Sequence, residues 1–432
     1  EAAREFSRLA DLLRQQGQPA PQIAHFLIRL LFCLFAEDAG LFDRPVFSQL
    51  VQALRNRPQT FTTQLAQLFQ AMSTGGAFGP EIIRHFDGRL FDDAQVLELD
   101  SQALETLYKV SRLDWSAIEP TIFGTLFERS LDPAKRSQLG AHYTSKDDIL
   151  LIIQPVLMQP LRREWEAAQA RAAELAAQRD EAKGQKRAAL QDKLASTLTG
   201  FADRIAATRV LDPACGSGNF LYLALRELLN LQKEVIQRSS ELGVGAFFPT
   251  VSPAQLRGIE INEYAHQLAQ TAIQIGYIQW MEENGYGIPE EPILQPLDNI
   301  RNMDAILAYD EAGKPYEPQW PEAEVIIGNP PFLGGGKLRA ELGDGYTEKI
   351  FKLYGDRLPN FSDLVCYWFE KARAMIEQGK AKRAGLLATN SIRNGASRKI
   401  LERIKISGDI FWAQSDRPWI LDGASVRVSM VG

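Results

Sequence analysis

Hydrophobic residues recur at helical spacing in the first part of the chain. Between residue 1 and about residue 126, apolar side chains return every three or four positions, for instance at Phe6, Leu9 and Leu13. Two short stretches, RNRPQ and STGGAFGP, interrupt this pattern with glycine, proline and polar residues. A period of 3.6 residues is typical of helices that share a core. We therefore expect an all-α domain in this region.

A second helical stretch, from about residue 149 to residue 207, is rich in alanine and in charges of both signs. Such a composition is typical of a solvated helical hairpin, and Gly184 marks the expected break between its two helices. We expect this hairpin to form an arm over residues 160–205. A contact between the arm and DNA phosphates or a partner protein is the alternative interpretation.

From residue 208 onward, short apolar runs alternate with amphipathic segments of helical length. Repeated strand–helix units imply a mostly parallel sheet covered by helices, so this part of the chain is predicted to be α/β. The predicted strands are RVLD (209–212), LRGIEI (256–261), EVIIGN (324–329), RAGLLATN (383–390), DIFWAQ (409–414) and SVRVSMV (425–431).

The net charge and the cysteines limit the kinds of partner and of site that the chain can have. The 432 residues carry a formal net charge of −6, so a nucleic-acid partner would need a local basic face or a further domain. The three cysteines are scattered without a CxxC pair, which predicts no metal site, no disulfide framework and a cytoplasmic location. The most apolar run, Ile23–Phe35, is too short to span a bilayer and contains Arg29. We expect a buried helix there and no membrane contact.

The sequence begins within a helical pattern and ends within a strand-like one. The chain starts without a methionine in a helical pattern, and it stops within the alternating run VRVSMVG. An alternating strand needs a partner strand to pair with. We therefore expect the sequence to be a fragment of a larger protein.

The first candidate site is the loop in RVLDPACGSGNF, where a predicted strand ends at Asp212. Pro213 and the Gly-Ser-Gly turn that begins at Gly216 allow the backbone to approach a ligand closely. Open α/β sheets bind nucleotides at such loops. The loop matches neither the Walker pattern nor GxGxxG, but Glu260 at the tip of the next strand can accept both hydroxyls of a ribose. The sequence thus predicts a ligand that contains adenosine.

The second candidate site is the loop in EVIIGNPPF, which follows another predicted strand. Pro330 and Pro331 fix the backbone and cannot donate hydrogen bonds, so their peptides present carbonyl oxygens in a stiff direction. The Asn329 amide and the Phe332 ring stand beside them in the sequence. Rigid acceptors next to an aromatic ring suit a planar ligand that carries an NH₂ group.

Together, DPACGSGNF and GNPPF resemble the motifs of the amino-group DNA methyltransferases that use S-adenosylmethionine. The upstream stretch QLGAHYTS, residues 138–145, resembles the third cofactor-binding element of these enzymes, and its place before the first loop is typical of many adenine enzymes with a C-terminal recognition domain. The match covers roughly residues 122–432. The stretch FLIRLLFCLFAEDAGLF, residues 26–42, resembles the helical connector of MmeI-like type IIL restriction–modification enzymes.

This resemblance implies a Rossmann-like, S-adenosylmethionine-dependent methyltransferase sheet over residues 126–432 and a helical connector over residues 1–125. In the family a nuclease precedes the connector and a target-recognition domain follows the methyltransferase. We see neither in this sequence. The partner implied is double-stranded DNA, with a nuclease and a recognition domain as possible further parts of the full protein, which would act in restriction–modification or a related phage-defence system.

The resemblance also implies the roles of the second loop. The Asn329 side-chain oxygen and the Pro330 carbonyl would accept the two hydrogens of the exocyclic amine of a flipped-out adenine. Pro331 would keep the loop stiff, and Phe332 would stack on the base. These four residues are the predicted catalytic set, and the reaction is direct methyl transfer to the amine nitrogen.

The remaining motif residues are expected to bind the cofactor. The first loop would line its methionine part, Glu260 would hold the ribose and Ile261 would pack on its adenine. Asp304 would accept a hydrogen bond from the adenine amine, while Tyr143 and Thr144 would close the carboxylate end. The predicted cofactor residues are Tyr143, Thr144, Asp212, Pro213, Ala214, Gly216, Glu260, Ile261 and Asp304.

Three alternatives stay open from the sequence. Protein glutamine methyltransferases also carry Asn-Pro-Pro-aromatic loops, so an amide in a protein is a possible acceptor. A DNA-binding scaffold that binds S-adenosylmethionine without turnover is a second possibility. Cytosine amine methylation fits the same chemistry, although those enzymes more often have serine where Asn329 stands.

Overall fold

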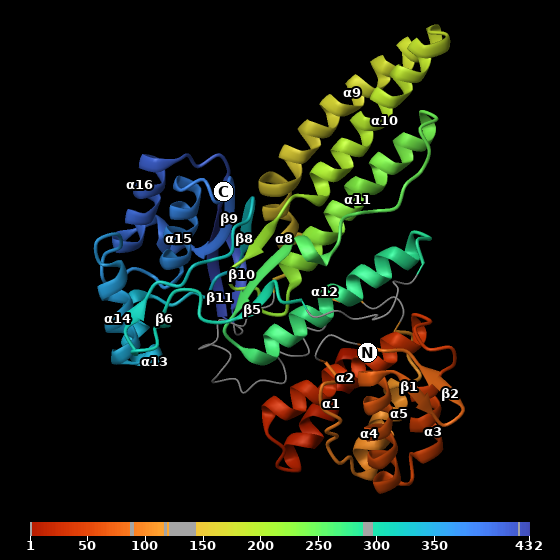
Figure 1. The fold of residues 1–432 in the computed structure, drawn as a ribbon. Helices are drawn as coiled ribbons and strands as arrows, with labels where there is room; N and C mark the ends of the chain where they lie inside the picture. The colour runs from red at the N-terminus through yellow and green to blue at the C-terminus, as the bar shows by residue number, and fades with distance from the viewer. Residues whose placement is uncertain (1, 87–89, 116–118, 121–143, 288–296, 422–423) are drawn as a thin grey trace. The chain divides into compact units, whose positions relative to one another are not determined.

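The computed structural model describes residues 2–86, 90–115, 119–120, 144–287, 297–421 and 424–432 (Figure 1). The chain forms two compact units, and each is assembled from separate segments of the sequence. The first consists of Glu1–Tyr143, Cys215–Tyr222 and Glu260–Met303, and the second of Thr144–Ala214, Leu223–Ile259 and Asp304–Gly432. The predicted domain boundary between residues 125 and 126 lies outside the described residues.

The first unit has a predominantly helical core, as the 3.6-residue pattern predicts. Phenylalanine and leucine side chains from all of its helices form one buried cluster, in which aromatic rings such as Phe32 and Phe86 meet edge to face. Its N-terminal helices are α1 (Ala2–Gln15), α2 (Ala20–Asp38), α3 (Val46–Leu54), α4 (Pro58–Thr74) and α5 (Ser101–Val110).

The prediction of an all-α domain is wrong in one detail. The stretch STGGAFGP belongs to an antiparallel hairpin, β1 (Gly76–Phe78) and β2 (Glu81–Ile83), and is not simply a loop. The turn contains Gly79 at φ 57°, a conformation that glycine adopts without steric cost. Strands of three residues are too short for the alternation of apolar and polar residues to be visible in the sequence.

Helix α2 is a core helix of the first unit, as expected for the most apolar run. By length and composition it could cross a membrane, but 67% of its apolar 18-residue window is buried inside the protein. Arg29 is fully buried on this helix. Its guanidinium donates to the carbonyls of Leu90 (2.7 Å) and Gln95 (3.0 Å) and pairs with Asp93. A buried charge needs such partners, which explains how an arginine is tolerated in this core.

Helix α12 (Glu263–Glu283) packs with the N-terminal helices although it follows them by more than a hundred residues. Its apolar side chains, among them Leu268 and Ile275, belong to the same buried cluster. His25 on α2 is hydrogen-bonded to Gln267 on α12 at 2.7 Å. The amphipathic pattern of α12 predicts a helix, but it does not reveal which partner the helix packs against.

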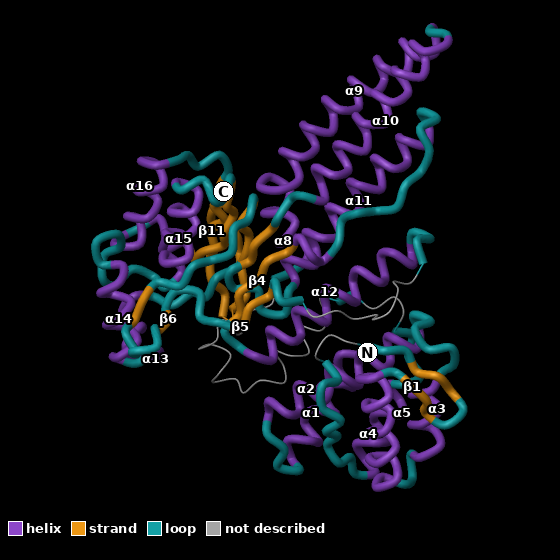
Figure 2. The backbone as a smooth tube through the Cα atoms, viewed as in Figure 1, coloured by secondary structure: helices purple, strands orange, loops and turns teal. Residues whose placement is uncertain are grey.

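A seven-stranded sheet with the order β10-β11-β9-β8-β3-β4-β5 confirms the predicted α/β architecture (Figures 1 and 2). Strands β4, β3, β8 and β9 are mutually parallel, whereas β11 pairs antiparallel with both β9 and β10. The strands are β3 (Val210–Asp212), β4 (Leu256–Glu260), β5 (Ile300–Asn302), β8 (Val325–Gly328), β9 (Arg383–Thr389), β10 (Ala413–Leu421) and β11 (Ala424–Val431).

The predicted strands differ from the structure in two ways. DIFWAQ is not a strand: residues 409–412 have no regular structure, and β10 starts only at Ala413. Its aromatic and β-branched residues instead line a cavity at the end of the sheet. Strand β5 at the edge of the sheet and the separate short hairpin of β6 (Ala308–Tyr309) and β7 (Pro315–Tyr316) are also missing from the predicted set, because strands of two or three residues leave no periodic signal.

Helices of the second unit lie on both sides of the sheet, with α15 and α16 on one side and α8 on the other (Figure 2). Helices α9 and α10 form the predicted arm and break at residues 182–183. The arm also packs on α11, where Arg162 forms a bidentate ion pair with Glu234. The helices are α8 (Lys146–Ile153), α9 (Gln159–Glu181), α10 (Gly184–Ala206), α11 (Asn219–Glu241), α13 (Leu338–Leu342), α14 (Asp344–Tyr354), α15 (Val365–Glu377) and α16 (Arg398–Ser407).

Candidate functional site

The two predicted loops follow the carboxyl ends of neighbouring parallel strands, at the same edge of the sheet. Strand β3 pairs with β8 in the register Val210 to Val325, so Asp212 and Gly328 end their strands side by side. A Cβ atom at position 328 would overlap the Asp212 carboxylate. Glycine at this position therefore lets the start of the second loop approach the end of the first.

The first loop is fixed by hydrogen bonds from both of its sides. Asp212 is 1% exposed, and its Oδ1 accepts a hydrogen bond from the Ala214 amide at 3.0 Å. The indole Nε1 of Trp368, on α15, donates to the Pro213 carbonyl at 2.9 Å. The turn after β3 is thus held in one conformation by its own aspartate and by a helix that follows much later in the sequence.

At the start of the second loop, the two ends of the Asn329 amide differ. Its Nδ2 donates to the Thr144 hydroxyl at 3.0 Å. Its Oδ1 is buried and has no hydrogen-bond partner in the described part of the chain. A buried acceptor without a donor is costly, and such groups are rare unless a ligand or water completes them. The position marks where a ligand donor would fit.

The far end of the second loop is tied to the segment before α15. Leu333, the residue after Phe332, donates its amide to Asp363 Oδ1 at 3.1 Å and accepts the Leu364 amide at 2.9 Å. Asp363 is buried, and its Oδ2 accepts from the Ser391 hydroxyl at 3.2 Å. Burial raises the pKa of Asp363, while these donors oppose the shift. Both ends of the Asn329–Phe332 loop are therefore anchored.

Glu260, in the first unit, organises the backbone around itself. Its Oε2 accepts the Gly216 amide and its Oε1 the Asn262 amide, each at 2.8 Å. Burial raises the pKa of Glu260 above its ordinary value, and the two amides act in the opposite direction. The next residue, Ile261, is 57% exposed, which is unusual for a large apolar side chain and leaves its surface open to a ligand.

Asp304 is held in place from two sides. Its Oδ1 accepts the amides of Ile306 and Leu307, at 2.8 and 3.1 Å. Its Oδ2 accepts the phenol of Tyr346, on α14, at 2.8 Å. Burial and the Asp304 charge raise the pKa of Tyr346, so its hydroxyl stays protonated as a donor. The carboxylate is consequently oriented by the protein.

The structure places most of the predicted residues but not all of them. Tyr143 lies outside the described residues. Pro330 is buried, and Pro331 and Phe332 are partly exposed at the loop. Sequence reasoning missed Trp368, Asp363 and Tyr346, although the pattern Ser-Asp-Leu before an amphipathic helix could have suggested a capping aspartate near residue 363.

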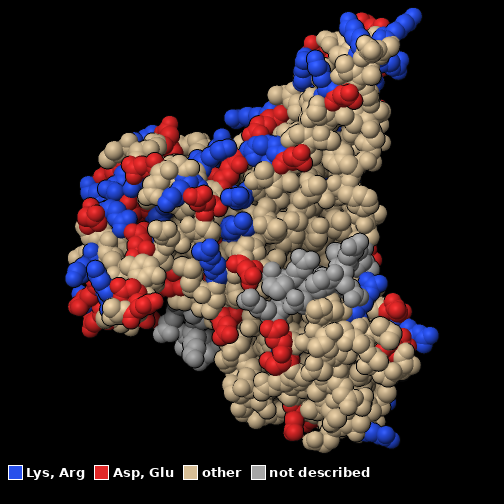
Figure 3. All heavy atoms as spheres, in the orientation of Figure 1, with Lys and Arg blue, Asp and Glu red and all other residues tan. Residues whose placement is uncertain are grey.

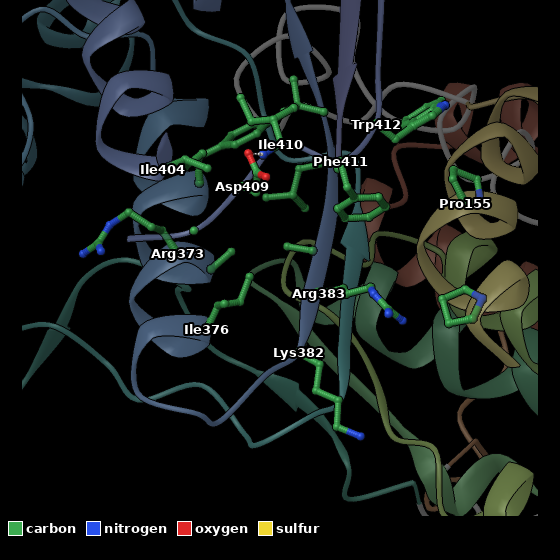
Figure 4. A pocket seen from close by; sticks show the side chains of 18 of the residues that line it. Pro155, Arg373, Ile376, Lys382, Arg383, Ile404, Asp409, Ile410, Phe411 and Trp412 are labelled. Carbon is green, nitrogen blue, oxygen red and sulfur yellow. Dashed lines mark hydrogen bonds between the residues drawn. The ribbon is translucent and has the colours of Figure 1, made fainter. Parts of the chain in front are cut away.

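A separate cavity of about 470 Å³ contains none of the predicted residues (Figure 4). Its walls include Pro155, Ile376, Phe411 and Trp412, and Lys382 and Arg383 at the amino end of β9 border it. The predicted loops follow the carboxyl ends of β3 and β8, and β9 is parallel to β8. The cavity therefore lies at the opposite edge of the sheet, and we assign it no part in the chemistry of the loops.

The described residues contain no cluster of three or more His, Cys, Asp or Glu side chains that could hold a metal ion. All three cysteines are buried, and none of them forms a disulfide within the described residues. Burial raises the pKa of Cys366 to about 12, so this thiol stays protonated near neutral pH.

Comparisons with known proteins match two separate parts of the chain. Residues 182–432 match the family described as the DNA-methyltransferase domain of MmeI, and residues 21–91 match the family described as the MmeI helicase spacer domain. DNA methyltransferase A of Bacillus subtilis (strain 168) is 30% identical over 100% of this chain and 48% of its own length.

Two further relatives were found. The solved structure of the type IIL restriction-modification enzyme MmeI in complex with DNA is 27% identical to this chain and has a TM-score of 0.77. The match covers 100% of this chain and 56% of the MmeI chain. A putative type II restriction enzyme and methyltransferase of Methanocaldococcus jannaschii is 26% identical over 38% of this chain and 14% of its own length. The chain spans about half the length of the first two relatives. Because the methyltransferase-domain family alone matches more than half of the residues, the protein belongs to the MmeI family and contains its DNA-methyltransferase domain.

Proposed function

We propose that the protein transfers a methyl group from S-adenosylmethionine to the exocyclic amine of a flipped-out adenine in double-stranded DNA. The observation that carries this proposal is the buried Oδ1 of Asn329, which has no hydrogen-bond partner among the described residues and would be satisfied by a donor from a ligand. An amine NH₂ group supplies such a donor. Membership of the MmeI family supports DNA as the molecule that bears the amine.

Asn329 and the loop after it would activate the amine. The nitrogen of an adenine amine is a poor nucleophile because its lone pair is delocalised into the ring. Acceptance of its two hydrogens by Asn329 Oδ1 and the Pro330 carbonyl favours a pyramidal nitrogen and stabilises the positive charge that develops there. Phe332 would stack on the base and offset part of the cost of flipping. No general base is needed before attack, since the proton can leave afterwards.

The chain offers groups that fit S-adenosylmethionine. Glu260 can accept the ribose hydroxyls through the remaining lone pairs of its oriented carboxylate, and the exposed Ile261 can cover one face of the adenine. Asp304 can accept from the adenine amine, and Asp212, Pro213, Ala214 and Gly216 provide the turn for the methionine part. When bound, the cofactor supplies an electrophilic methyl group. Tyr143 is the remaining proposed cofactor residue, whereas Thr144, expected beside it from the sequence, contacts Asn329 in the structure.

DNA would have to be bound without an overall basic field. On the face that Figure 3 shows, acidic and basic side chains are interspersed, in keeping with the net charge of −6. We therefore propose that most phosphate contacts and all sequence readout come from further parts of the full-length protein, including a target-recognition domain. A nuclease domain would complete a restriction–modification enzyme, which we expect to act in the cytoplasm.

An amide of a protein is the second candidate acceptor, because a glutamine side chain presents the same NH₂ donor to Asn329 Oδ1. The experiment that separates the candidates supplies the full-length protein with S-adenosylmethionine labelled in its methyl group, together with unmodified genomic DNA or with a protein extract. Label in DNA supports the proposal, whereas label in protein alone contradicts it. Cofactor binding without any transfer would indicate a scaffold.

A further inference from the structure

The Asn329 amide can present either of two chemically opposite ends to a ligand. Its oxygen accepts hydrogen bonds and its nitrogen donates them, yet the two ends have nearly the same shape. A rotation of 180° about the last side-chain bond exchanges them. Activation of an amine requires the oxygen to face it, because an NH₂ group opposite another NH₂ group is repulsive. Something in the protein must therefore select one orientation.

The contact that accompanies the observed orientation comes from Thr144. The Thr144 hydroxyl accepts Asn329 Nδ2 at 3.0 Å, which leaves Oδ1 as the end without a partner in the described part of the chain. Thr144 is 4% exposed, so water does not compete freely for this hydrogen bond. The position suits a residue that orients Asn329 from behind.

The segment that carries Thr144 is itself well anchored. Ser145 caps helix α8, because its hydroxyl accepts the Asp148 amide at 3.2 Å. Asp148 in turn forms a 2.6 Å ion pair with Arg417 on β10. Thr144 is thus fixed at the start of a helix that the sheet holds in place.

We propose that Thr144 is a positioning residue that holds Asn329 with its oxygen toward the acceptor amine, and that it thereby favours bases with an amine over bases with a carbonyl at the same place. This inference rests on the proposed function and differs from the role of Thr144 as a cofactor contact. Adenine and cytosine carry an NH₂ group there. Guanine and thymine carry a carbonyl, which would face the Asn329 oxygen and be repelled.

The test compares Thr144→Val with Thr144→Ser in the full-length protein. Valine has the shape of threonine without the hydroxyl, whereas serine keeps the acceptor. We expect kcat for methyl transfer to fall about tenfold or more in Thr144→Val, with the Kd for S-adenosylmethionine changed by less than about twofold. Thr144→Ser should stay within about threefold of the wild type.

Thr106→Val serves as the control for the loss of a buried hydroxyl. Thr106 is 3% exposed, and its hydroxyl bonds to the Gln102 carbonyl within α5. We expect its kcat to be unchanged. A neutron crystal structure of Thr144→Val, which distinguishes the amide nitrogen from the oxygen, should show the Asn329 side chain turned or in two orientations, which a merely structural role of Thr144 would not produce.

A weaker Kd for S-adenosylmethionine with unchanged kcat in Thr144→Val would overturn the proposal and make Thr144 a cofactor contact. Unchanged values of both would overturn it as well. If the wild type methylates protein instead of DNA, the proposed substrate fails, but kcat and Kd measured with that acceptor still decide the role of Thr144. If no acceptor is methylated, an unturned Asn329 in the variant structure overturns the positioning role and a turned one supports it.

Discussion

The buried carboxylate of Asp363 accepts the backbone amide of Leu333 at 3.1 Å, immediately after the Asn-Pro-Pro-Phe loop. The amide of Leu364 returns a hydrogen bond to the Leu333 carbonyl at 2.9 Å. Leu333 is therefore held at both of its backbone polar groups by one short segment. Since the prolines make the loop stiff, fixing its far end also fixes the direction of the residues that would contact the target base.

Replacement of Asp363 tests whether this anchor matters for turnover. Asp363→Ala leaves the Leu333 amide without an acceptor. We therefore expect the free energy of unfolding to fall by about 1–3 kcal/mol and kcat to fall about tenfold or more. Asp363→Asn keeps an oxygen for Leu333 and should retain most of the activity. Asp310→Ala, which removes a carboxylate that accepts two backbone amides in an exposed turn, is the matched control. Equal kcat in Asp363→Ala and the wild type would show that the anchor is dispensable.

Glu260 is expected to govern cofactor affinity. In Glu260→Gln, one of the amides of Gly216 and Asn262 would face an NH₂ group, and one ribose acceptor would be lost. We predict a Kd for S-adenosylmethionine raised by about tenfold or more, measured by calorimetry. Glu263→Gln, on the exposed side of the following helix, should bind normally. An unaltered Kd in Glu260→Gln would remove Glu260 from the cofactor site.

Tyr346 should influence the same affinity through Asp304. Tyr346→Phe removes the phenol that orients the Asp304 carboxylate, so we expect the Kd for S-adenosylmethionine to rise by about fivefold while kcat at saturation is unchanged. Tyr309→Phe is the matched control, because its hydroxyl contacts only the Lys349 ammonium on an exposed surface among the hydrogen bonds of the described residues. Normal binding by Tyr346→Phe would argue against a role of Asp304 in holding the adenine.

The stability of the first unit should depend on pH through Glu37. Burial raises the pKa of this carboxyl from 4.5 to about 7, even though Ser48 donates to it. The folded state therefore holds a proton that the unfolded state releases, and stability falls as pH rises from about 4.5 to about 7, by up to about 3 kcal/mol. Glu37→Gln should flatten this dependence in urea unfolding at pH 5 and pH 8. A variant as pH-dependent as the wild type would contradict the assignment.

The sequence was sufficient for the features that depend on local pattern and on strand direction. Asp212 and Asn329 each follow a short apolar run, and the carboxyl ends of parallel strands meet at one edge of a sheet. Their neighbourhood could therefore be predicted, and the pairing of β3 with β8 confirms it. The helical arm followed in the same way from its composition.

Contacts between distant side chains could not be predicted. Thr144 lies 185 positions from Asn329, and Trp368 lies 155 positions from Pro213. No periodicity links such residues, because their meeting depends on how helices α8 and α15 are set against the sheet. The same limit explains why α12 was predicted as a helix without its partner α2.

Methylation of adenine can be measured by mass spectrometry of nucleosides from the DNA of cells that express the full-length gene, beside cells that express Asn329→Ala. Under the proposed function we expect N6-methyladenine with the wild type and none with the variant, which should still bind S-adenosylmethionine because Asn329 does not hold the cofactor. Unmodified adenine in both cultures, with the purified wild type still binding S-adenosylmethionine, would contradict it.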